Sequence, residues 1–190
     1  MASTRNTVWV VTGGNRGIGL GLVKALLARP SITVIATVRN KQARSAIRSA
    51  VADLPKGDGT AFSIIQLNFA TALGPKQIRN AFNINHVDLS ALNVVNVSSS
   101  VSYISYYEVI AGIYRPSKAA LNWLMRAPYL QNKGLIAFAL YPGFITTDIG
   151  KSAAINVKGA VKGSLKIIDS ATREAVSGKF VSYKGQELPW

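Results

Sequence analysis

A glycine-rich turn directly between a predicted strand and a predicted helix is the feature that most limits how this chain can fold. The turn occupies residues 12–19 and reads TGGNRGIG. The β-branched and aromatic run 7–12 before it predicts a buried strand, and apolar residues at helical spacing over 16–29, ended by Pro30, predict a helix. Glycine is needed where φ is positive or where the backbone must approach a ligand without an intervening Cβ. A strand, a tight turn and a helix in succession predict the first unit of an α/β sheet.

The same alternation continues along the chain. Strands are predicted over 32–38, 62–67, 88–99, 135–141 and 179–183, the last one at a sheet edge, and helices over 41–54, 75–82, 114–131 and 157–175. Strands and helices alternating at this pitch favour a doubly wound parallel α/β sheet with right-handed crossovers. The length of 190 residues, without an internal repeat or a linker, predicts a single domain over 1–190.

The composition excludes several kinds of site. The chain has no cysteine and one histidine, His86, so we expect no disulfide, no cysteine nucleophile and no metal site. The lack of cysteine suits a reducing compartment. No signal peptide and no apolar run near the roughly 20 residues of a membrane span are found. We therefore expect a cytoplasmic protein without a membrane partner.

The charge is strongly basic. Lys and Arg number 22 against 8 Asp and Glu, a formal net charge of +14, and no acidic residue precedes Asp53. A basic field attracts anions, such as dinucleotide phosphates or nucleic acid. The basic residues are scattered singly rather than in a run of five, so we expect no nucleic-acid partner. A nucleic-acid-binding protein stays a third hypothesis, and it predicts salt-sensitive DNA binding.

The position of the glycine turn indicates what it binds. A turn between a strand and a helix aims unpaired N–H groups and the positive helix end at a pyrophosphate, although a lone glycine triplet can also be a plain turn. After the second strand, an acid would bind the ribose 2′-hydroxyl of NAD, whereas an arginine suits a 2′-phosphate. Here Arg39 follows that strand with no acid nearby, and Arg16 lies in the turn. This arrangement favours NADP(H) over NAD(H), unless Arg39 is merely a solvated surface base.

Several motifs together resemble one family. TGGNRGIG resembles the TGxxxGxG motif of short-chain dehydrogenases/reductases, and YRPSK (114–118), YPGFITTD (141–148) and KFVSYKGQELPW (179–190) extend the resemblance over nearly the whole chain. Within the family the chain is most similar to the carbonyl-reductase-like branch that includes norsolorinic acid ketoreductase. The resemblance implies a Rossmann-like fold and an NADPH-dependent oxidoreductase. Its substrate would be the ketone or carbonyl, or the corresponding alcohol, of a small or aromatic, polyketide-like molecule.

A tyrosine and a lysine in a predicted helix are the candidate catalytic pair. Tyr114 and Lys118 are four residues apart, which places both on one helix face. A nearby ammonium favours the phenolate form of a tyrosine, so Tyr114 can exchange a proton with a substrate oxygen. The resemblance implies that Lys118 also holds the nicotinamide ribose. Residues 96–99 resemble the NxSS motif of the family, which selects Ser99 to polarise the carbonyl, with Ser98 and Ser100 as close rivals.

The remaining candidate residues are expected to bind the cofactor. Those at 142–147 match the loop that meets the nicotinamide carboxamide, although an ordinary Pro-Gly turn would look the same. Asn68 stands where the family usually has an acid near the adenine. The full predicted set is Thr12, Gly13, Asn15, Arg16, Gly17, Ile18, Gly19, Arg39, Asn68, Asn93, Pro142, Gly143, Ile145 and Thr147.

One strand stands where the family pattern has two. Asn93 is interpreted as the remnant of the asparagine that ends the first strand, and it runs directly into Val94 and the serine motif. A crossover helix and a strand, about 40–50 residues, are missing from this place. A rival alignment makes residues 82–85 (FNIN) the motif of that helix with its catalytic asparagine, but it requires two deletions and leaves a stub of helix. A further shortening after Gly150 obscures the substrate.

The loss has physical consequences. Removing a helix–strand unit preserves right-handed winding, yet it moves everything after the junction by about 4.8 Å, whereas catalytic geometry tolerates roughly 0.5 Å. It also removes part of the family's usual dimer surface, so a homo-oligomer is not favoured. Pro128 additionally predicts a kink in the catalytic helix. The alternative function is therefore a truncated, catalytically inactive nucleotide-binding member of the family.

Overall fold

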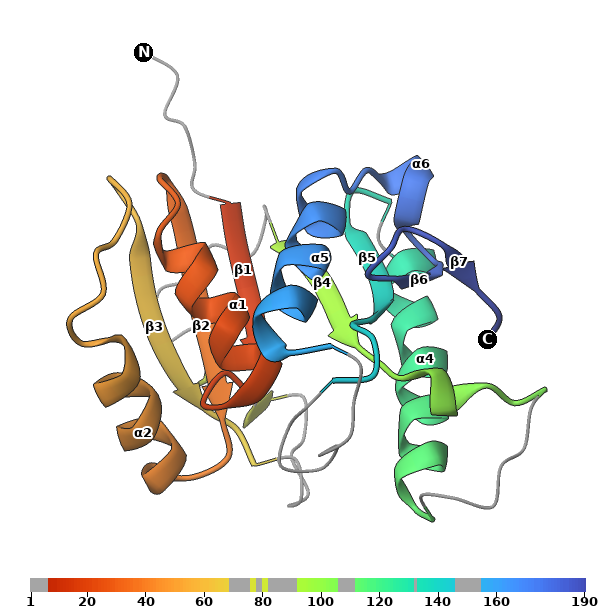
Figure 1. Cartoon of the computed structure of the whole chain (residues 1–190), viewed down its shortest axis with the longest axis horizontal. Coiled ribbons are helices and arrows are strands. Elements are labelled where there is room, and N and C mark those ends of the chain that lie inside the picture. Colours follow the sequence, from red (N-terminus) through yellow and green to blue (C-terminus); the bar gives the residue numbers. More distant parts are fainter. Residues whose placement is uncertain are drawn as a thin grey trace. The chain divides into compact units, whose positions relative to one another are not determined.

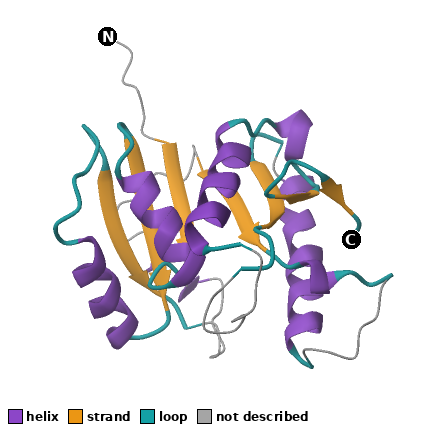
Figure 2. Ribbon diagram, in the orientation of Figure 1, coloured by secondary structure: helices purple, strands orange, loops and turns teal. Residues whose placement is uncertain are grey.

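The computed structural model of the chain (Figure 1) describes residues 7–68, 76–77, 80–81, 92–105, 112–131, 133–145 and 155–190. The chain divides into two compact units, Met1–Asn93 and Val94–Trp190. Both units combine strands with helices, as the colours of Figure 2 show. The single domain over 1–190 stays a prediction.

The first unit contains three parallel strands in the order β3-β2-β1. They are β1 (Thr7–Thr12), β2 (Ile32–Val38) and β3 (Ala61–Gln66). Val8 pairs with Thr33 in the register of β1 and β2, and Val34 pairs with Phe62 in that of β2 and β3. Six of the seven residues of β2 are buried, as expected for an apolar strand in the middle of a parallel sheet. The three predicted strands are confirmed to within one residue.

Two helices connect these strands. Helix α1 (Gly17–Leu27) buries an apolar face that includes Val23 and Leu27, and α2 (Lys41–Val51) buries Ile47. The side chain of Asn40 accepts a hydrogen bond of 2.8 Å from the backbone N–H of Ala43, which caps the start of α2. Both helices end about two to three residues before the predicted ends. The predicted helix 75–82 lies largely outside the described residues.

Strand β4 (Leu92–Val97) crosses from the first unit into the second. Its first two residues pair in parallel with β1, Leu92 with Val8 and Asn93 with Trp9. Beyond its end, the backbone N–H of Ser98 donates to the carbonyl oxygen of Leu140 in the neighbouring strand β5 (Ile136–Tyr141). The first unit ends at Asn93, the residue after which the sequence analysis places the missing segment.

The strands of the second unit follow the order β4-β5-β6-β7. Helix α4 (Tyr114–Gln131) has the predicted bounds and continues through the position of Pro128, where the sequence predicts a kink. The core of this unit gathers Met125 of α4, Ala137 and Ala139 of β5, and Phe180. Trp190 stacks on Phe180 with the ring centroids 6.0 Å apart.

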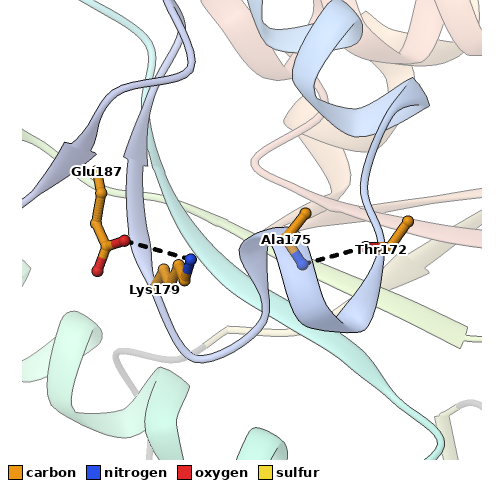
Figure 3. Close-up of polar contacts among 4 residues, drawn as sticks. All are labelled: Thr172, Ala175, Lys179 and Glu187. Carbon is orange, nitrogen blue, oxygen red and sulfur yellow. Dashed lines mark hydrogen bonds and ion pairs between the residues drawn. The ribbon is translucent and has the colours of Figure 1, made fainter.

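Two details of the second unit correct the predictions. The single helix predicted over 157–175 is two helices, α5 (Val157–Asp169) and α6 (Arg173–Val176). The break arises because the Thr172 side chain accepts a hydrogen bond of 3.1 Å from the N–H of Ala175 and thereby starts a new helix (Figure 3).

The predicted edge strand is also wrong in its position. Strand β6 (Phe180–Ser182) lies between β5 and an antiparallel β7 (Glu187–Leu188), so β7 is the outermost strand of this order. Gly185, with a φ of +86°, allows the tight turn between β6 and β7. Lys179, which directly precedes β6, forms an ion pair of 3.3 Å with Glu187 of β7 (Figure 3). Among the described residues, no helix is long and apolar enough to cross a membrane.

Candidate functional site

The glycines of the turn at 12–19 meet two different requirements. Gly13 and Gly17 have φ values of +63° and +54°, and a Cβ built on either would meet no atom within 4 Å. Both therefore combine a left-handed backbone with open space in front of it. A Cβ on Gly19 would instead lie 2.9 Å from the carbonyl carbon of Gly13 and collide with its oxygen. Gly13 and Gly17 therefore leave room for a ligand. Gly19 lets the first turn of α1 pack closely on the backbone of Gly13.

The start of α1 is suited to an anion. Arg16 occupies the N-cap position in extended backbone, with a φ of −158°. A guanidinium has no acceptor atom, so the side chain of Arg16 cannot cap the first N–H groups of the helix as a serine or aspartate would. These N–H groups and the positive end of the helix dipole suit a negatively charged ligand, as does the charge of Arg16.

A cleft of about 390 Å³ lies beside this turn in the first unit. Its volume falls within the range of about 300–1,000 Å³ that is usual for ligand pockets. Two arginines line it, and none of its described lining residues is acidic, so its charge favours a phosphate. The lining residues are Thr12, Gly13, Asn15, Arg16, Thr37, Val38, Arg39, Leu67 and Asn68.

Six predicted cofactor residues lie together in this cleft. They are Thr12, Gly13, Asn15, Arg16, Arg39 and Asn68, while Gly17, Ile18 and Gly19 form the first turn of α1 next to them. Sequence reasoning missed Thr37, Val38 and Leu67, which come from the ends of β2 and β3. Their positions at the carboxyl ends of parallel strands, where ligands of open α/β sheets bind, could have identified them.

In the second unit, the serine motif ends β4 and leads into a short 3-10 helix, Ser100–Ser102. The Ser99 hydroxyl accepts a long hydrogen bond of 3.5 Å from the N–H of Val101. Ser98 is 3% exposed, and its hydroxyl has no hydrogen-bond partner within the described part of the chain. The partly exposed Ser99 is thus better placed than Ser98 to meet a substrate.

The tyrosine and the lysine of YRPSK lie on one face at the start of α4. Lys118 Nζ is 5.5 Å from the centroid of the Tyr114 ring, close enough for a cation–π contact. The same ammonium donates a hydrogen bond of 2.9 Å to the carbonyl oxygen of Val97. Burial lowers the pKa of Lys118 below its ordinary value, while Tyr114 is 46% exposed. The pair therefore combines an ammonium that is hydrogen-bonded to the backbone with a phenol that solvent or a ligand can reach.

The predicted nicotinamide loop is described only in part. Gly143 has a φ of +96°, and a Cβ on it would lie 2.8 Å from Ile155 Cδ1 and 3.0 Å from Tyr183 Cε1. Ile145 is buried and forms an isolated parallel bridge with Ile155. Pro142 precedes this glycine at the end of β5, and Thr147 lies outside the described residues. Gly143 therefore has both a conformational and a packing reason to be glycine.

The predicted catalytic and cofactor residues fall in both units. The cleft and the turn belong to the first unit. Asn93 also belongs to it and pairs with Trp9 of β1. Ser99, Tyr114 and Lys118 belong to the second. A larger groove of about 940 Å³ along α5 contains none of the predicted residues. Among the described residues, no group of three or more His, Cys, Asp or Glu side chains could hold a metal ion.

The chain is similar in sequence to several known proteins. The sequence matches no protein-family model. It is 29% identical to norsolorinic acid ketoreductase nor1 of Dothistroma septosporum, over 98% of this chain and 94% of that protein. It is 34% identical to the C-signal protein of Myxococcus xanthus, over 63% of this chain and 74% of the relative. Other relatives are named short-chain dehydrogenases.

The fold is also found among solved structures. An NADPH-bound carbonyl reductase from chicken fatty liver superposes with a TM-score of 0.71 at 23% identity, covering 98% of this chain and 100% of the other. This likeness confirms the doubly wound, mostly parallel Rossmann-like fold. Together with the relatives, it places the chain in the short-chain dehydrogenase/reductase family, a family of oxidoreductases.

The chain is shorter than the region it matches. Its alignment with the ketoreductase of Dothistroma septosporum runs over 254 positions, so at least 64 of them are gaps in these 190 residues. The internal truncation predicted from the sequence is thereby supported. The place of the loss, after Asn93 in β4, stays a prediction.

Proposed function

We propose that this protein is an NADPH-dependent oxidoreductase that reduces the ketone of a small or aromatic, polyketide-like molecule by hydride transfer. The observation that carries the proposal is the cleft at the carboxyl ends of β1, β2 and β3, whose described lining includes Arg16 and Arg39 and no acidic residue. The relatives named norsolorinic acid ketoreductase support the substrate class.

The residues of the cleft fit such a cofactor. The open space in front of Gly13 and Gly17 admits a pyrophosphate to the backbone N–H groups of the turn. Arg39, exposed directly after β2, is placed to bind a ribose 2′-phosphate, and no carboxylate from the described part of the chain lines the cleft and competes with it. The bound dinucleotide supplies the hydride. NADP(H) is therefore proposed over NAD(H).

The second unit supplies the groups that handle the substrate oxygen. Ser99 donates a hydrogen bond to the carbonyl and polarises it, and Tyr114 delivers the proton to the same oxygen. Lys118 stabilises the phenolate that remains, because its ammonium lies 5.5 Å from the centroid of the Tyr114 ring and a nearby positive charge favours the ionised phenol. One of its three N–H donors is used by Val97, which leaves two for the phenolate or a ribose hydroxyl.

Calorimetric titration with NADPH and NADH tests the cofactor. Arg39→Ala should weaken NADPH binding at least tenfold and leave NADH binding within twofold. Arg48→Ala is the matched control, because it removes an exposed arginine of α2 that does not line the cleft. An equal loss of affinity for NADPH and NADH, or an equal loss in Arg39→Ala and Arg48→Ala, would contradict a specific contact between Arg39 and the 2′-phosphate. Arg39 would then contribute only to the overall positive charge.

A second candidate function follows from the truncation. The chain would then bind the nucleotide without turnover, as a truncated member of the family, and the minimum of 64 gaps in the alignment favours this alternative. A carbonyl-reduction assay separates the two. Measurable turnover that Tyr114→Phe abolishes supports the reductase, whereas NADPH binding with no turnover in either protein supports the binding module.

A further inference from the structure

A buried asparagine on the catalytic helix contacts the loop that carries the candidate serine. Asn122 follows Tyr114 and Lys118 by two turns and one turn of α4, so the three side chains share one helix face. Asn122 is 3% exposed, and its Nδ2 donates a hydrogen bond of 2.8 Å to the hydroxyl of Ser102. Ser102 is 2% exposed, so the contact is shielded from water.

The direction of each hydrogen bond in this contact is fixed. The Ser102 hydroxyl lies 2.7 Å from the carbonyl oxygen of Ser99, which can only accept, so the hydroxyl proton points to Ser99. The lone pairs of the hydroxyl must then accept from the Asn122 amide. The result is a chain of two hydrogen bonds, from the amide of Asn122 through Ser102 to the backbone of Ser99, of which the first is buried and the second partly buried.

The loop is therefore held at two points from a single helix. Lys118 binds the carbonyl oxygen of Val97 before the serines, and Asn122 binds Ser102 after them. Ser99 lies between these two points. Because the same helix carries Tyr114, the two contacts fix the distance between the proton donor and the hydroxyl that polarises the carbonyl. A displacement of about 1 Å in such a pair is enough to cost roughly a hundredfold in rate.

We propose that Asn122 is a positioning residue, which sets Ser99 against Tyr114 by holding Ser102. The inference rests on the proposed reduction at Ser99, but the contact itself is a property of the folded chain. A structural role alone would lower stability without changing the turnover of the folded protein. A positioning role predicts a lower kcat with an unchanged KM for NADPH.

The test is a double-mutant cycle with Asn122→Leu, Ser102→Ala and the double variant, and with Asn122→Ala in case the leucine does not fit. Ser164→Ala is the matched control, because Ser164 is fully buried in α5 and its hydroxyl has no partner among the described residues. We expect each single variant to lower kcat roughly ten- to a hundredfold. The double variant should be no slower than the slower single one, because both changes break the same chain of hydrogen bonds.

Hydrogen exchange provides a readout that does not need turnover. The backbone N–H groups of Ser102 and Tyr103 donate to Ser99 and Ser100 in the 3-10 turn. Their exchange should accelerate at least tenfold in the variants at 122 and 102 and stay unchanged in Ser164→Ala. Unchanged exchange, or a kcat per folded molecule equal to that of the wild type, overturns the proposal. A wild type that does not bind NADPH would refute the proposed function instead, and exchange alone would then decide whether Asn122 holds the loop.

Discussion

Lys118 Nζ donates a hydrogen bond of 2.9 Å to the carbonyl oxygen of Val97, the last residue of β4. The acceptor is a backbone atom, so the contact survives any change of the side chain at position 97. It ties the start of the catalytic helix to the end of the strand that carries the serine motif. The ammonium is therefore part of the framework of the second unit as well as a candidate catalytic group.

Burial of Lys118 makes stability depend on pH in a defined direction. Its pKa in the folded protein is lower than the ordinary value of 10.5, because burial disfavours the charged form. Between these two values the unfolded chain binds more protons than the folded one, so the free energy of unfolding rises with pH. We expect the wild type to gain stability relative to Lys118→Met as the pH rises from neutral towards 10.5.

Urea denaturation at several pH values measures this difference. Lys162→Met, which removes an exposed lysine of α5, controls for the change in net charge. A wild-type advantage that shrinks as the pH rises would contradict the assigned cause.

Gly19→Ala should damage the turn through packing. The added Cβ would collide with the carbonyl oxygen of Gly13, which cannot move without shifting the turn itself. Overpacking of this kind costs about 1–3 kcal/mol, and the displaced turn should also lose affinity for NADPH. Chemical denaturation and nucleotide titration measure the two effects. Gly134→Ala is the control, since a Cβ there meets nothing within 4 Å, and an equal loss in both variants would discount the collision.

The three neighbouring serines should separate clearly by mutation. Ser99→Ala removes the hydroxyl proposed to polarise the carbonyl, and losses of this kind lower kcat by about 100- to 1,000-fold. Ser98→Ala should leave activity intact and stability unchanged or higher, because the buried hydroxyl it removes has no partner among the described residues. Ser100→Ala should stay near the wild type. Steady-state kinetics with thermal melting distinguishes them, and a large loss of kcat in Ser98→Ala would transfer the role to that residue.

The cap of α6 should contribute more to stability than the ion pair near it. Thr172→Ala removes the acceptor for the N–H of Ala175 and is expected to cost about 1 kcal/mol. Glu187→Gln breaks the pair with Lys179, but Glu187 is 64% exposed, so the loss should not exceed about 0.5 kcal/mol. Urea denaturation of both variants ranks them, and the reverse order would show that the pair is stronger than its exposure suggests.

The sequence predicts the first unit well because its signals are local. A glycine turn between an apolar run and an amphipathic helix leaves few alternatives, and β1 and β2 have the predicted bounds. The arginine after β2 lines the cleft as the pattern suggests. Thr37 and Leu67 escape prediction because each is an unremarkable residue of a strand end, and only the pairing of the strands brings them to the cleft.

The second unit is harder to predict because its decisive contacts are not local. Glu187 and Leu188 are too few to form a periodic pattern, and they form a strand only because β6 lies beside them. The role proposed for Asn122 depends on a partner 20 residues away, which no motif indicates. The break at Thr172 was predictable in principle, since threonine is a common N-cap residue and its side chain can accept a hydrogen bond from the N–H three residues later.

The boundary of the two units inside β4 limits how the molecule can be dissected. A fragment ending at Asn93 would keep only two residues of that strand, and the complementary fragment would begin in the middle of it. The cut would divide β4 between its second and third residues, and a short strand remnant with unpaired N–H and C=O groups promotes self-association. Functional work on this protein therefore calls for point variants in the intact chain rather than isolated halves.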